Sequence, residues 1–92
     1  MGEMGVTEKL AQFAVDTNYD SLPEEAVTAA KRAVLDTLAT TVAGCREEAA
    51  TIITAYVREL DAAGDAGVVG SGFQTAASEA ALANGTLAHA LD

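Results

Sequence analysis

The fold is decided by residues 21–44, which read SLPEEAVTAAKRAVLDTLATTVAG. Ser21 and Glu24 have the spacing of a capping box, and Pro23 suits a first helical turn because it has no N–H to satisfy. Apolar side chains then recur every three or four residues, and Gly44 favours a stop. The apolar positions are Val27, Ala30, Val34, Leu38 and Val42. We therefore predict a helix of about twenty residues, largely buried along this apolar face.

A shorter helix is expected before this one. Thr7 can act as its N-cap, and Leu10 and Phe13 follow at helical spacing. The helix should run to about Asp16, where Asn18-Tyr19-Asp20 interrupts the pattern. Residues 1–6 show no periodicity, so we expect a loose lead-in.

A third helix is expected over residues 47–63, with Gly64 ending it. Its apolar stripe comprises Ala49, Ile52, Ile53, Tyr56, Val57 and Leu60. We expect Tyr56 to lie in the core with its hydroxyl near the edge.

Residues 65–72, DAGVVGSG, carry three glycines around a pair of valines. A phosphate-binding loop would need the G-x-G-x-x-G order or the P-loop lysine, and both are missing here. A short extended strand and turn is the better interpretation. Thr75 can then cap a fourth helix over residues 76–83, which Asn84-Gly85 would close. These patterns predict one all-α domain over residues 1–92, an antiparallel bundle of about four to five helices with a short extended Gly/Val segment.

The composition excludes several classes of function. Fourteen acidic residues against five basic ones give a net charge of −9, whereas nucleic acids and anionic membranes require clustered cations. The acidity fits either an ordinary solvated surface or a salt-rich habitat. The single cysteine, Cys45, excludes an internal disulfide, and a passive thiol at a loop-to-helix junction is favoured over a nucleophile. No pattern for a metal or cofactor site and no signal peptide is evident, so we expect a cytoplasmic protein without a cofactor.

The only histidine, His89, stands three residues before Asp92. In a helical turn opened by Thr86, these two side chains would share one face. They could form an acid–base couple, or they could simply stabilise the turn. Asp36, inside the long helix, could hold a loop backbone or merely face solvent, and a structural role is favoured over a catalytic one. No helix-ending residue follows Asp92, so we expect these residues to be the start of a longer protein.

Taken together, the motifs resemble the amino-terminal part of MmgE/PrpD proteins. They occur in the order Leu10-Ala11-Phe13, Leu22-Pro23-Glu25, Ala33-Leu35-Asp36-Thr37-Leu38, Ala43-Gly44, Gly70, Ala80-Ala81, Asn84-Gly85 and His89-Ala90-Leu91-Asp92. The family includes 2-methylcitrate dehydratases, cis-aconitate decarboxylases and iminodisuccinate epimerases. The resemblance implies a helical domain completed by later chain segments, a smaller α+β domain that is missing here, a homodimer, and chemistry without a required metal or iron–sulfur cluster.

In this family an aspartate after the histidine opens an acidic stretch that lines the active site. Asp92 matches that aspartate and His89 matches the histidine. The resemblance thus implies a 2-methylcitrate dehydratase-type lyase that abstracts a proton next to a carboxylate of a di- or tricarboxylate. A decarboxylase or epimerase of the same family is the alternative.

Such chemistry develops negative charge that needs cations or hydrogen-bond donors around it. The five cations are Lys9, Lys31, Arg32, Arg46 and Arg58, and none follows Arg58 in the sequence. We therefore expect His89 and Asp92 to be part of a larger site, and the 92 residues alone to be inactive. A different class of function remains open, a non-catalytic helical module. In either case we expect a homo-oligomer or association with the missing remainder of the protein, because the core is thin and the apolar faces are wide.

Overall fold

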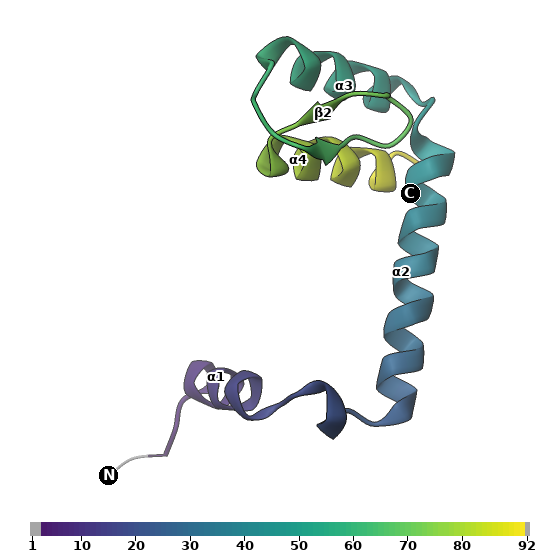
Figure 1. Ribbon diagram of the computed structural model, residues 1–92. Coiled ribbons are helices and arrows are strands. Elements are labelled where there is room, and N and C mark those ends of the chain that lie inside the picture. Colours follow the sequence, from purple (N-terminus) through teal and green to yellow (C-terminus); the bar gives the residue numbers. More distant parts are fainter. Residues whose placement is uncertain (1–2, 92) are drawn as a thin grey trace. The chain divides into compact units, whose positions relative to one another are not determined.

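The computed structural model describes residues 3–91, which are mostly helical (Figure 1). The chain forms two compact units that divide between Arg32 and Ala33. The first contains α1, Val6–Asp16, the short 3₁₀ helix η1, Tyr19–Ser21, and the beginning of α2, Glu24–Gly44. The second contains the rest of α2, α3, Glu48–Leu60, the strands β1, Ala66–Gly67, and β2, Gln74–Thr75, and α4, Ala77–His89. The predicted all-α fold is confirmed.

In the first unit α1 ends at Asp16, as predicted, but it begins earlier than expected. Gly5 occupies the N-cap position, so the prediction of Thr7 as the cap is wrong. At the other end, the Thr17 N–H donates to the carbonyl oxygen of Phe13 at 3.0 Å, which closes the last turn.

The capping box predicted for Ser21 and Glu24 is also wrong. Ser21 instead forms a reciprocal cap with Asn18: its backbone N–H donates to the Asn18 side chain at 3.1 Å, and its hydroxyl accepts from the Asn18 N–H at 3.0 Å. Because Ser21 forms this cap within η1, it does not cap α2. Pro23 lies just before α2 rather than in its first turn, and its carbonyl oxygen accepts the Ala26 N–H at 3.0 Å.

The length of α2 and its end at Gly44 agree with the prediction. The helix is not largely buried, however, which contradicts the prediction. Val34, Leu38 and Val42 are each more than half exposed, and the buried residues of the helix are Thr41 and Gly44. The sequence pattern correctly marks an apolar face, yet the described residues do not cover it. None of the described helices is long and apolar enough to cross a membrane.

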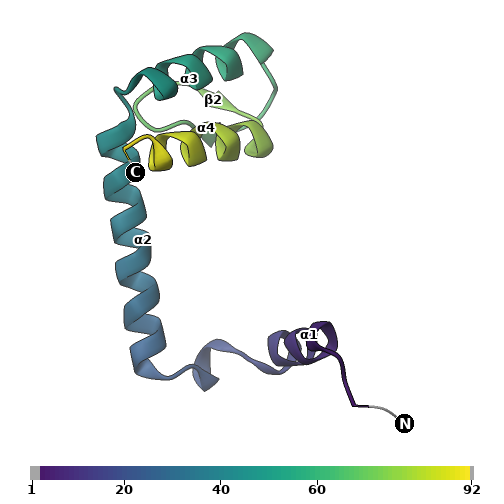
Figure 2. The same cartoon turned by 180° about the vertical axis from the view of Figure 1, so that it is seen from behind.

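In the second unit α3 packs against α4, and a two-stranded hairpin also packs against α4 (Figures 1 and 2). The strands pair antiparallel, with Ala66 opposite Thr75 and Gly67 opposite Gln74. The extended Gly/Val segment was predicted, whereas its partner strand β2 was not. The core consists of Val57, Val68, Ala80 and Ala83, with Ile53, Ala66 and Phe73 packed against it.

The end of α3 differs from the prediction. Asp61 adopts a left-handed conformation with φ 46°, so the helix stops at Leu60 rather than near Ala63. Gly64 therefore does not end the helix. A Cβ at this position would collide with the Thr75 carbonyl and lie 2.7 Å from the Cα of Ala76. Gly64 thus permits the close approach of the chain to β2. The face of α3 that points into the core contains Ala50, Ile53 and Val57. Tyr56 lies outside this face, so it is 51% exposed rather than in the core.

Candidate functional site

The helix that carries His89, α4, is longer than the sequence predicts. It continues without interruption through Asn84 and Gly85 to His89, so the expected break at these two residues and the separate turn from Thr86 are both wrong. Thr75 does not cap the helix either. It lies in β2 with its side chain buried, its hydroxyl donates to the Ala62 carbonyl at 3.4 Å, and Ala76 takes the N-cap position.

Asn84 explains why the helix continues. Its side-chain carbonyl oxygen accepts the Val69 N–H at 2.9 Å, and its side-chain NH₂ donates to the Gly67 carbonyl at 2.9 Å. The side-chain amide of Asn84 therefore uses one acceptor and one donor to satisfy two backbone groups, as a neighbouring β-strand would. This side chain ties residues 67–72, here called the glycine turn, to α4 about one and a half turns before His89.

Two further contacts fix α4 against the rest of the second unit. Leu87 is buried, and Gly44 at the end of α2 lies against the Leu87 backbone so closely that a Cβ on Gly44 would collide with the Leu87 carbonyl. The same Cβ would lie 3.3 Å from the Cβ of Ala90. Gly44 thus ends α2, as predicted, and also makes room for the last turn of α4.

His89 is the last residue of α4, and its side chain is exposed. It lines two shallow hollows. One, of about 260 Å³, is shared with Asp36, Thr37 and Thr40 of α2 and with Gly85 and Ala88. The other, of about 650 Å³, is mainly apolar, and its lining includes Ala49, Leu82 and Thr86.

The structure places Asp36 and His89 in the lining of the same hollow, which the sequence spacing could not indicate. The Asp36 side chain is exposed and, within residues 3–91, forms no hydrogen bond to a loop backbone. An acidic group and an imidazole that line one hollow provide proton-transfer groups, but they provide no positive charge for a carboxylate substrate. No described lysine or arginine lines either hollow.

Asp92 lies outside the described residues. Its pairing with His89 therefore stays a prediction, as do the catalytic roles of both residues.

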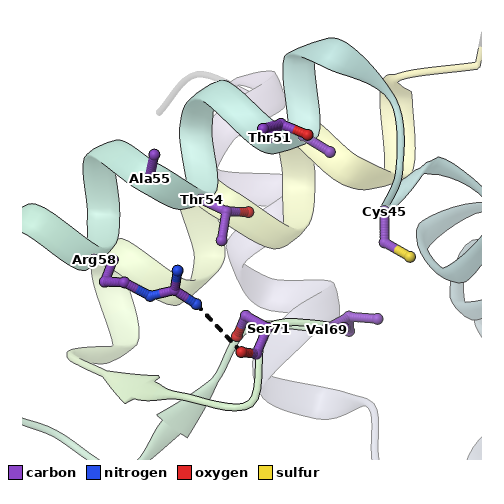
Figure 3. Close-up of a pocket in the computed structure, with 9 residues that line it drawn as sticks. Cys45, Thr51, Thr54, Ala55, Arg58, Val69 and Ser71 are labelled. Atoms are coloured by element: carbon purple, nitrogen blue, oxygen red, sulfur yellow. Dashed lines mark hydrogen bonds between the residues drawn. The ribbon is translucent and has the colours of Figure 1, made fainter.

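A third hollow, of about 260 Å³, lies between α3 and the glycine turn (Figure 3). Its lining includes Cys45, Thr54, Arg58, Gly70 and Ser71. Cys45 lies in the turn between α2 and α3, as predicted, and its thiol is half-buried. Sequence reasoning did not identify this hollow, because Arg58 and Ser71 meet across thirteen residues of chain.

No set of three or more His, Cys, Asp or Glu side chains in residues 3–91 is arranged to hold a metal ion.

Comparisons with known proteins identify one family. The model of the MmgE/PrpD N-terminal domain matches residues 8–92, which is nearly the whole chain. No curated protein and no solved structure gave a significant match. Because the family match covers far more than half of the sequence, the chain belongs to the MmgE/PrpD family, and residues 8–92 correspond to the N-terminal domain of that family.

Proposed function

We propose that the chain is the amino-terminal part of a 2-methylcitrate dehydratase-type lyase that acts on a di- or tricarboxylate. The reaction would begin with abstraction of the proton next to a carboxylate, and elimination of water would follow. The observation that carries this proposal is the family match, which extends through His89 to Asp92.

The position of His89 supports a role in proton transfer. Histidine is the side chain that most often transfers protons in general acid–base catalysis. His89 is exposed at the end of a helix that Asn84 and Leu87 hold in place, so a substrate can reach it. In this proposal Asp92 contributes to the same site.

The positive charge that the reaction requires would come from groups outside the linings of the two His89 hollows. A substrate with two or three carboxylates needs cationic groups, and the described linings of the His89 hollows contain none. We therefore propose that His89 and Asp92 form one edge of a larger site, and that the 92-residue chain alone is inactive.

The test is an assay of the protein expressed from the complete reading frame that contains these residues. It is incubated with 2-methylcitrate, citrate or cis-aconitate, and the products are identified. We expect an unsaturated acid from 2-methylcitrate, and we expect H89Q to lower the rate by about a hundredfold. The matched control is R46Q, which alters an exposed residue outside both hollows and should leave the rate unchanged. Release of CO₂ from cis-aconitate would instead favour a decarboxylase, and interconversion of isomers would favour an epimerase.

A second candidate function is a helical self-association module. The observation that favours it is the number of large apolar side chains that are exposed on the second unit, among them Leu35, Leu38, Ile52 and Tyr56. Surfaces of this kind are typical of interaction sites. Sedimentation at micromolar concentration should show an oligomer, and a compact monomer would contradict this candidate.

A further inference from the structure

The hollow between α3 and the glycine turn differs in charge from the rest of the chain. The sequence has fourteen acidic residues, yet none of them lines this hollow. The one charged side chain of its described lining is Arg58. In a protein with a net charge of −9, the described lining of this hollow therefore holds a cation and no carboxylate, and the acidic residue next to Arg58, Glu59, lines a neighbouring hollow instead.

The Arg58 side chain is exposed, and two contacts restrict it. Its Nη2 donates to the Ser71 carbonyl at 3.3 Å, and its guanidinium carbon lies 4.7 Å from the centre of the Phe73 ring. A guanidinium has five N–H donors, so most remain for a ligand. Because the two contacts already restrict the side chain, little conformational entropy is lost when a ligand binds.

Two other residues of the lining, Thr54 and Gly70, carry donors that are available to a ligand. The half-buried hydroxyl of Thr54 and the backbone N–H of Gly70 have no hydrogen-bond partner within residues 3–91. The neighbouring N–H groups are occupied, since that of Val69 donates to Asn84 and that of Ser71 donates to the Val68 carbonyl at 3.1 Å. Figure 3 shows Arg58 and Thr54 reaching from α3 toward the turn.

We propose that this hollow binds one carboxylate group of a small organic acid. A fixed guanidinium with a hydroxyl and a backbone N–H is a typical set of donors for an oxyanion, and the planar fork of arginine matches the two oxygens of a carboxylate. The volume of about 260 Å³ suits a compact acid. No residue lines both this hollow and either hollow beside His89, so the proposed site is separate from the candidate active site.

The test is an NMR titration of the ¹⁵N-labelled 92-residue chain with sodium acetate and sodium malonate, with sodium chloride keeping the ionic strength constant. We expect saturable shifts at the Arg58 Nε–H and the Gly70 N–H. R58Q should weaken binding by about tenfold or more. R46Q removes the same charge from a residue outside the hollow, so it should bind acetate as the unchanged chain does.

Since Arg58 also anchors the turn, T54V provides an independent variant. It keeps the contacts of Arg58 with Ser71 and Phe73, and it should weaken binding about threefold because one hydroxyl donor is lost. Shifts that do not saturate, or that are equal in R58Q and the unchanged chain, would overturn the proposal. So would inorganic phosphate saturating the hollow while acetate does not. The readout is binding rather than turnover, so this test can fail while the proposed lyase function holds, and the reverse is also true.

Discussion

The side-chain amide of Asn84 and the backbone N–H of Val69 are joined by a hydrogen bond of 2.9 Å. A second bond of the same length runs from this amide to the Gly67 carbonyl, so one side chain of α4 holds the glycine turn from both sides. The turn lines the hollow that contains Arg58, and the helix ends at His89. Asn84 therefore connects the two regions for which functions are proposed here.

The first prediction concerns this amide. N84A should lower the free energy of unfolding by about 2 kcal/mol, because two backbone groups lose their partner. N84D keeps the acceptor for the Val69 N–H but removes the donor to the Gly67 carbonyl. It should also lower the free energy of unfolding, but by less than N84A does. Urea unfolding followed by circular dichroism measures both. The matched control is N18A, since Asn18 makes only local bonds in η1 and its loss should cost about 1 kcal/mol or less. Equal losses for N84A and N18A would contradict the role of Asn84.

The second prediction compares two glycines. G44A places a Cβ against the Leu87 carbonyl and should destabilise the chain by about 1–3 kcal/mol. Gly85 lies inside α4 with nothing within 4 Å of an added Cβ, so G85A should stabilise the chain by about 0.5–1 kcal/mol. Thermal unfolding of the two variants separates the effects. A loss of stability in G85A would show that this face of α4 is covered.

The third prediction compares two leucines of α4. Leu87 is fully buried, whereas Leu82 is 47% exposed. L87A should cost about 2–5 kcal/mol, and L82A should cost less than about 1 kcal/mol. Both values come from chemical unfolding at low protein concentration. If L82A costs as much as L87A, and only at high concentration, then Leu82 lies in an interface between copies.

The fourth prediction concerns salt. Two copies that each carry a charge of −9 repel one another, and raising the salt from about 0.1 M to about 1 M shortens the screening length from about 10 Å to about 3 Å. Self-association through the exposed apolar faces should therefore strengthen with salt, and L35S should weaken it. Sedimentation velocity at both salt concentrations measures this. A monomer at every salt concentration would exclude the module as a function.

Local sequence signals predicted the helices well where local chemistry decides them. The recurrence of apolar residues up to Gly44 gave the extent of α2, and the glycine–valine segment gave β1. The errors occur where a distant partner decides the structure. Asn84-Gly85 is typical of a helix end, but the bonds from Asn84 to Val69 and Gly67 stabilise a continuous helix instead.

The candidate site was predictable only in part. The spacing of His89 and Asp92 singled out the end of α4, and the family match agrees with the resemblance that the motifs indicated. Asp36 lies more than fifty residues before His89, so its place in the same hollow depends on how α2 and α4 pack. The anchoring of Arg58 by Ser71 and Phe73 likewise has no local pattern.

The most direct test of the central claim is one assay on two proteins. The 92-residue chain and the protein expressed from the complete reading frame are each incubated with 2-methylcitrate, citrate and cis-aconitate, and product formation is followed. We predict an unsaturated acid from 2-methylcitrate with the complete protein and no product with the 92-residue chain. Turnover by the 92-residue chain alone would contradict the claim that cations from outside it are needed, and no turnover by the complete protein would contradict the proposed activity.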